Sequence, residues 1–160
     1  MAVLNPYNYA KPKGAAVLRK STLNPRNSTK KQDLSSNNAN QYLEQKVLSA
    51  SSEELTLMLY EGAIKFINQA ILFNDEGLIE KTSNAILRAG AIYSELQSTL
   101  DKEYEISENL DQLYDYVLYR LAEANIEKSN DILKEVLVMS EEFRDTWKQA
   151  MEIAKSESGE

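Results

Sequence analysis

Residues 51–73 read SSEELTLMLYEGAIKFINQAILF, and this stretch decides the fold class. Ser51 and Glu54 have the spacing of a capping box, in which each side chain binds a free backbone N–H at a helix start. Apolar residues then recur at intervals of three and four, which is typical of an amphipathic helix. We therefore expect a helix over about 52–73. Its expected inner face consists of Leu55, Leu59, Ala63, Phe66, Ile67 and Ala70.

The same periodicity recurs three times after this helix. It predicts further helices at about 76–100, 108–127 and 130–155, each long enough to span a small domain. No strand-like alternation of polar and apolar residues competes with this pattern. Four helices of similar length with short connections favour an all-α fold, an antiparallel up-down four-helix bundle.

Turn-forming and capping residues separate the predicted helices. The run Asn74-Asp-Glu-Gly77 interrupts the first pattern, and the charged stretch 101–106 reads as a loop. Ser107 is the expected N-cap of the third helix, and Ser129 or Asn130 is expected to open the fourth. The connections are therefore short, as a bundle requires.

Charge divides the chain of 160 residues into two parts. Residues 1–40 carry seven basic groups against one acidic group, a net charge of +6, whereas residues 41–160 carry a net charge of −13. The first part is also rich in Asn, Ser and Thr, and it contains all three prolines, Pro6, Pro12 and Pro25. Such a composition predicts a flexible or disordered basic arm at 1–40 and a helical domain at 41–160.

Two roles for the basic arm follow from its charge. A nucleic-acid-binding tail would use the basic residues on phosphates. These residues are scattered, however, and the acidic body would repel phosphate, so we favour an arm that rests on its own body and expect no nucleic-acid partner.

Residues that most often carry catalysis or bind metals are missing. The sequence has no cysteine and no histidine, which excludes thiol chemistry, Cys- or His-ligated metals and the usual general base at neutral pH. Asp111 and Asp115 lie among polar neighbours, which is typical of a solvated helix face. We therefore expect no enzyme, no cofactor and no metal site.

The chain also lacks the patterns that direct a protein into or across a membrane. No apolar run reaches the roughly 18 residues of a spanning helix. The start does not follow the pattern of a signal peptide. We therefore expect a cytoplasmic protein without membrane insertion.

Apolar surface exceeds what a bundle needs on two of the helices. Four residues widen the apolar stripe of the first helix to about 220°, and two tyrosines of the third helix lie nearly opposite its inner stripe. Each residue alone is unremarkable, because exposed apolar side chains are common. Together they indicate a surface for an amphipathic or extended partner. These candidate partner-binding residues are Leu57, Tyr60, Ile64, Ile71, Tyr116 and Tyr119.

Three segments resemble one known family. Residues 49–67, SASSEELTLMLYEGAIKFI, are similar to the first long helix of the flagellar secretion chaperones, the FliS family, where T-A-x-P-E-E-L-x-L-M-L-Y-x-G-x-x-K-F is typical. Residues 113–125, LYDYVLYRLAEAN, and 143–150, FRDTWKQA, resemble two further family segments in the same order. The resemblance covers about residues 41–155.

The resemblance implies a function. Members of that family are cytosolic, non-catalytic helical bundles that bind the C-terminal segment of flagellin. They prevent its premature polymerisation and support its delivery to the flagellar type III export apparatus, so an export-gate component is a further expected partner. The residues alone leave a second interpretation open, a non-enzymatic adaptor that binds a regulatory partner through the same surface. They also leave open a monomer or a weak homodimer.

The N-terminal part departs from the family pattern. Family members begin with an N-P-Y-x-x-Y-like segment shortly before the first long helix, whereas Asn5-Pro6-Tyr7 lies far upstream here. The second tyrosine corresponds to Tyr42. In the family this segment can cover the client site as a cap, which implies a capping role for Tyr42, Val47 and Leu48.

Overall fold

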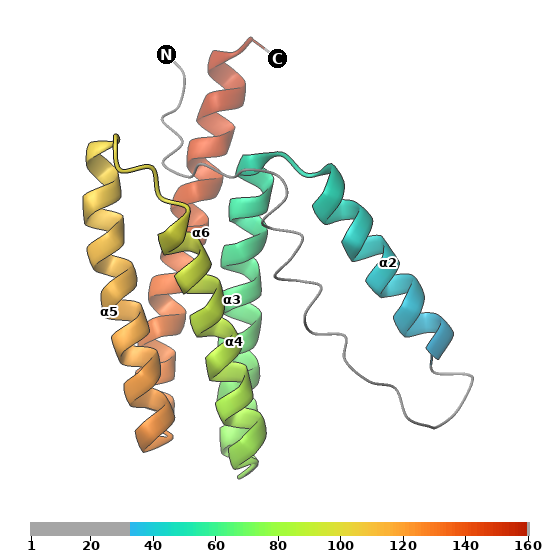
Figure 1. Cartoon of the computed structure of the whole chain (residues 1–160), viewed down its shortest axis with the longest axis vertical. Coiled ribbons are helices and arrows are strands. Elements are labelled where there is room, and N and C mark those ends of the chain that lie inside the picture. Colours follow the sequence, from blue (N-terminus) through green and yellow to red (C-terminus); the bar gives the residue numbers. More distant parts are fainter. Residues whose placement is uncertain (1–32, 160) are drawn as a thin grey trace. The chain divides into compact units, whose positions relative to one another are not determined.

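The computed structural model describes residues 33–159 (Figure 1). The chain divides into two compact units, whose described parts are residues 33–55 and 56–159. Every element in the described range is helical, so the predicted all-α class is confirmed.

The first unit contains a helix that the sequence analysis did not predict, α2 (Asp33–Ser49). Residues 33–40, which we assigned to the flexible arm, are therefore helical, and residues 1–32 lie outside the described part. Neither proline nor glycine occurs between Pro25 and Gly62, and Lys46 in the last turn suits the negative helix end. We predicted no helix here because the stretch is rich in Ser and Asn. The absence of Pro and Gly nevertheless permits one.

Four longer helices follow: α3 (Ser52–Asp75), α4 (Ile79–Ser98), α5 (Glu105–Glu127) and α6 (Asn130–Glu157). From α3 to α6 the chain runs alternately down and up (Figure 1). The predicted boundaries lie within a few residues of the observed ones.

The start of α3 has the predicted capping box. The backbone N–H of Glu54 donates to Ser51 Oγ at 3.2 Å, and the N–H of Ser51 donates to Glu54 Oε2 at 3.1 Å. At the start of α6, Ser129 Oγ accepts from the N–H of Ile132 at 3.4 Å. Both serines therefore cap the helices for which we predicted them.

The predicted cap of α5 is wrong. The helix begins at Glu105 after Tyr104, and Ser107 is buried inside its first turn. The hydroxyl of Ser107 donates instead to the carbonyl oxygen of Asp101 at 2.5 Å. Ser107 thus links the preceding loop to the first turn of α5. Its hydroxyl is satisfied by a backbone carbonyl oxygen and not by a backbone N–H of the helix.

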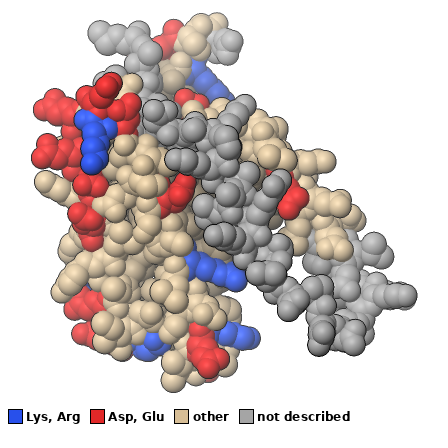
Figure 2. Space-filling model, in the orientation of Figure 1, with Lys and Arg blue, Asp and Glu red and all other residues tan. Residues whose placement is uncertain are grey.

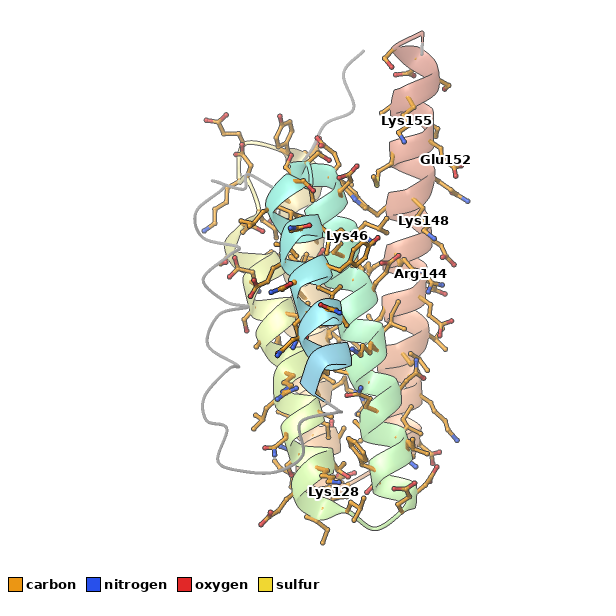
Figure 3. All side chains as sticks on the ribbon, turned by 90° about the vertical axis from the view of Figure 1, so that its right-hand side faces the viewer. Lys46, Lys128, Arg144, Lys148, Glu152 and Lys155 are labelled. Atoms are coloured by element: carbon orange, nitrogen blue, oxygen red, sulfur yellow. The ribbon has the colours of Figure 1, made fainter. Side chains whose placement is uncertain are left out.

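Hydrogen bonds join the α3–α4 turn to the α5–α6 turn. Asn74 Nδ2 donates to the carbonyl oxygen of Lys128 at 2.7 Å and to Asn130 Oδ1 at 2.8 Å. Asn130 Nδ2 donates in turn to Asp75 Oδ1 at 2.6 Å. Lys128 has the left-handed backbone conformation (φ 50°) that ends α5, and Figure 3 shows it at this end of the helices. These bonds hold two connections that are more than fifty residues apart in sequence.

The core contains one aromatic residue from each of the four long helices, Tyr60, Tyr93, Tyr114 and Phe143. The ring of Phe143 lies 5.9 Å from that of Tyr60, 6.3 Å from that of Tyr93 and 5.5 Å from that of Tyr114, between centroids. Tyr93 and Tyr114 are 5.7 Å apart. We call these four residues the aromatic layer. Because every helix contributes to it, the layer couples the position of each helix to the other three.

Candidate protein-docking surface

Two of the six predicted surface residues belong to the core. Tyr60 is only 2% exposed, and its hydroxyl lies 2.5 Å from that of Tyr114. Ile64 is also buried. The prediction that these two contact a partner is therefore not supported by their position. Thr56, a polar residue four positions before Tyr60, is also fully buried, so the inner face of α3 passes through both residues.

The other two predicted residues of α3 remain within reach of solvent. Leu57 and Ile71 are half-buried, and Leu72 beside Ile71 is exposed. These three side chains therefore expose aliphatic surface on the outside of α3, which a partner could bury.

Tyr116 is 43% exposed and links α5 to α6. Its hydroxyl donates to Glu135 Oε1 at 2.5 Å. Arg120 donates to the other oxygen of Glu135 through Nη2 at 2.6 Å and to Glu123 Oε2 at 2.7 Å. The position of Tyr116 is thus fixed by a charged cluster at the surface.

The cluster changes the acidity of its members. The hydrogen bond from Tyr116, followed by those from Arg120, lowers the pKa of Glu135 below its ordinary value. The same bond to Glu135 raises the pKa of Tyr116, and the bonds to Glu135 and Glu123 raise that of Arg120. The bonds of this cluster hold its side chains in place at the surface.

Tyr119 is the most exposed of the predicted residues, at 65%. It shares the outer face of α5 with Ile126, seven residues further along and 85% exposed. Sequence reasoning missed Ile126, although its spacing from Tyr119 is two helical turns. Leu113 is 42% exposed and adds to the apolar area of α5.

The predicted capping residues lie on α2. Tyr42 and Leu48 are exposed and Val47 is half-buried. They belong to the unit of residues 33–55, and their capping role stays a prediction.

Charge is distributed unevenly over the helices. Between 101 and 115 the sequence carries six acidic residues and a single basic one, Lys102. The second half of α6 instead carries basic side chains in succession (Figure 3), with Glu152 among them and Arg144 paired with Asp145 at 3.0 Å. Among residues 33–159 the strongest single-sign region is therefore the acidic one, which suits a basic partner group and not a phosphate backbone.

Residues 33–159 contain no cluster of three or more carboxylates placed to hold a metal ion. Within the same range, no helix combines the length and the apolar character that crossing a membrane requires. The chemically notable feature of this part of the chain is its exposed apolar side chains.

Aliphatic and aromatic side chains on the outer faces of a helical bundle are the kind of surface that helical protein-binding domains use. A sequence profile described as "Flagellar protein FliS" matches residues 35–154. The chain therefore belongs to the FliS family of flagellar secretion chaperones, which is not a family of enzymes.

Curated relatives agree with this assignment. The flagellar secretion chaperone FliS of Bacillus subtilis is 38% identical over 111 residues, which cover 69% of this chain and 84% of the relative. The protein of the same name from Salmonella typhimurium is 34% identical over 110 residues, covering 67% and 82%. That from Escherichia coli is 32% identical over 115 residues, covering 68% and 82%.

Proposed function

We propose that the protein is a cytoplasmic export chaperone that binds the C-terminal segment of flagellin. In this role it prevents premature polymerisation and supports delivery to the flagellar type III export apparatus. The observation that carries the proposal is the exposed apolar face of α5, with Tyr116 and Tyr119, in a member of a secretion chaperone family. Leu57 and Ile71 of α3 supply further aliphatic area.

The physical basis is the hydrophobic effect combined with folding upon binding. A chain segment that is disordered when free becomes ordered when it binds to a preformed surface. The loss of conformational entropy on binding then opposes the gain from buried apolar area. The affinity is therefore moderate for the area buried, which suits a chaperone that must release its client at the export gate. While bound, the apolar side of the segment is covered and is not free to assemble with other flagellin subunits.

Tyr119 is the contact we expect to matter most on α5. It is exposed, and tyrosine offers a large rigid contact area with a polar group at its end. Tyr116 is 43% exposed, and its hydroxyl donates to Glu135. A ring that is already fixed loses less conformational entropy when a partner packs on it.

The test is calorimetric titration of the protein with a peptide of the flagellin C-terminal segment. We expect binding by the natural chain and binding about tenfold weaker or worse for the Tyr119→Glu variant, because a carboxylate replaces the aromatic contact. Thr146→Glu introduces the same charge at an exposed position of α6 and serves as the matched control.

Binding that is absent in the natural chain contradicts the proposal and favours an adaptor that takes a different partner. Co-purification from the native cell then distinguishes the two functions, because an export chaperone is recovered with flagellin and an adaptor is not. A polymerisation assay monitored by light scattering adds a functional measure. We expect the natural chain to suppress filament growth at stoichiometric amounts.

A further inference from the structure

Helix α5 is more acidic than helix electrostatics favour. Between Glu105 and Glu127 it carries six acidic side chains and one basic side chain, Arg120. Acidic residues in its first turn suit the positive end of the helix dipole. Glu127 ends the helix at the negative end of the dipole, where a basic residue is favourable. The acidity of α5 therefore does not follow from the stability of the helix itself.

Acidic residues also lie one turn apart along α5. Side chains three or four positions apart are neighbours on a helix surface, and like charges at these spacings are destabilising. Three such pairs are Glu108 with Asp111, Asp111 with Asp115, and Glu123 with Glu127. Positive charge from outside the helix would offset this repulsion.

The described residues supply little of that positive charge. Arg120 is paired with Glu123 at 2.7 Å and with Glu135 of α6 at 2.6 Å. Among residues 33–159 the one further ion pair joins Arg144 to Asp145 on α6. The other five acidic side chains of α5 therefore form no ion pair within this part of the chain.

Four of these five side chains are exposed and lie on one side of the helix. They are Glu105, Glu108, Asp115 and Glu127, and we call them the acidic face of α5. At 3.6 residues per turn they fall within about 120° around the helix axis. Figure 2 shows acidic side chains gathered at its upper left, over the start of α5, with one basic side chain among them. A single exposed ion pair is weak, so a partner for this face must carry several basic groups.

The complementary charge is present in the same sequence, outside the described residues. Residues 1–32 contain seven basic residues and no acidic one, whereas residues 33–160 contain 25 acidic and 11 basic residues. A fully extended chain of 32 residues spans at most about 110 Å, and the 23 residues of α5 form a helix about 35 Å long. The segment is therefore long enough to follow the whole acidic face. Because it belongs to the same chain, it also has a high effective concentration, which favours it over a free partner of equal charge.

We propose that residues 1–32 bind the acidic face of α5 in their own chain, through ion pairs of their lysines and arginines with its carboxylates. The contact offsets the like-charge repulsion along α5. It requires no client, and it is distinct from the capping role predicted for α2, which depends on apolar side chains. The segment of a second copy is the less suitable occupant, because residues 41–160 of two copies, each of net charge −13, repel each other.

The experiment uses the full chain with a paramagnetic label. Because the sequence has no cysteine, Ser21→Cys introduces a single attachment site among the basic residues. The label broadens the NMR signals of amides that lie near it, and we expect broadening along α5. Raising the salt concentration from about 0.1 M to about 1 M shortens the screening length from about 10 Å to about 3 Å and should reduce the broadening by at least about half.

Three substitutions in the labelled chain change its net charge by the same amount. Glu108→Lys and Glu127→Lys lie in the acidic face, and each is expected to reduce the broadening of α5 about twofold or more. Glu152→Lys makes the same change at an exposed position of α6 and is expected to leave the broadening unchanged. Thermal melting followed by circular dichroism establishes that all three variants are folded.

Trypsin supplies a measurement that needs no label, because it cleaves after lysine and arginine. Cleavage within residues 1–32 tracks the population of chains in which the segment is free. We expect it to be about twofold faster or more in Glu108→Lys and Glu127→Lys than in Glu152→Lys, with the cleaved sites identified by mass spectrometry.

Broadening that is absent from α5, or that is equal in all three variants, overturns the proposal. So does broadening that appears only when labelled chains are mixed with isotope-enriched chains that carry no label, because this result assigns the contact to a second copy. The proposed function stands or fails separately, since it is tested by titration with the flagellin peptide.

Discussion

The hydroxyl groups of Tyr60 on α3 and Tyr114 on α5 lie 2.5 Å apart in the interior, although the residues are 54 positions apart in the chain. Both tyrosines also contact Phe143 of α6 through their rings. This buried polar contact is satisfied in the observed arrangement of the helices, so it favours that arrangement over shifted ones. The aromatic layer fixes the helices relative to one another, and so it also determines where the outer faces lie, on which a client is proposed to bind.

The first prediction concerns the hydroxyl of Tyr60. Tyr60→Phe keeps the ring packing and removes one partner of a buried hydrogen bond, so we expect a loss of about 1–2 kcal/mol in the free energy of unfolding. Tyr60→Ala also removes the ring and is expected to cost about 3–5 kcal/mol. Urea unfolding followed by circular dichroism measures both. Equal losses for the two variants would contradict the separate contributions of ring and hydroxyl.

The second prediction concerns the bonds between the two turns. Asn74→Ala removes the amide that donates to Lys128 and Asn130, so we expect a loss of about 1–2 kcal/mol, in keeping with partly buried neutral hydrogen bonds. Asn68→Ala, at an exposed position of the same helix, is the control and is expected to change stability by less than about 0.5 kcal/mol. A loss at Asn68 as large as that at Asn74 would show that the turn contacts are not the cause.

The third prediction concerns residues 1–32. Deletion of this segment is expected to leave a single cooperative thermal transition, because the family match begins at residue 35 and the buried hydrophobic core runs from Ala50 to Trp147. Client binding should persist or tighten. A broad, non-cooperative transition in the shortened chain would show that the segment is needed for folding.

Periodicity in the sequence predicts much of the fold. On α4 the residues that are buried in the structure, from Thr82 to Leu96, lie on one face at the spacing that helical periodicity predicts. On α3 the prediction was correct for Ala63, Ile67 and Ala70. It missed Thr56, because hydropathy counts threonine as polar, and it placed Tyr60 and Ile64 on the outer surface although both are buried. Polar residues can be buried wherever a partner satisfies them, and a single sequence does not show the partner.

The same limit applies to the core of α6. Ser140 is fully buried because its hydroxyl donates to the carbonyl oxygen of Val136 at 2.8 Å and accepts from the hydroxyl of Tyr93 on α4. Neither bond can be predicted from the spacing of apolar residues.

The candidate site was predicted only in part for a related reason. Exposed tyrosines on α5 follow from their position opposite the inner stripe. Which side chains of different helices form one surface depends on which helices are neighbours and in what register, and the register is set by contacts such as that of Ser83 with Asn125. Helical periodicity gives the direction of a side chain about its own helix axis and not its neighbour on the next helix.

The fourth prediction uses the titration of Tyr93. Burial raises the pKa of this phenol well above its ordinary value near 10, because the charged form loses its hydration in the core. A group whose pKa is raised by folding adds stability that is fully present below the unfolded pKa and is lost as the pH rises toward the folded one. We therefore expect the free energy of unfolding to fall above about pH 10.

Tyr93→Phe tests this contribution, because it removes the phenol hydroxyl and keeps the ring. The variant is expected to be less stable than the natural chain at pH 8, where Ser140 loses the hydrogen bond from Tyr93. As the pH rises from 8 to 11 the difference should shrink, since only the natural chain retains an ionisable group at this position. Urea unfolding at the two pH values measures the change, and a difference that stays constant or widens would show that Tyr93 ionises as readily in the folded chain as in the unfolded one.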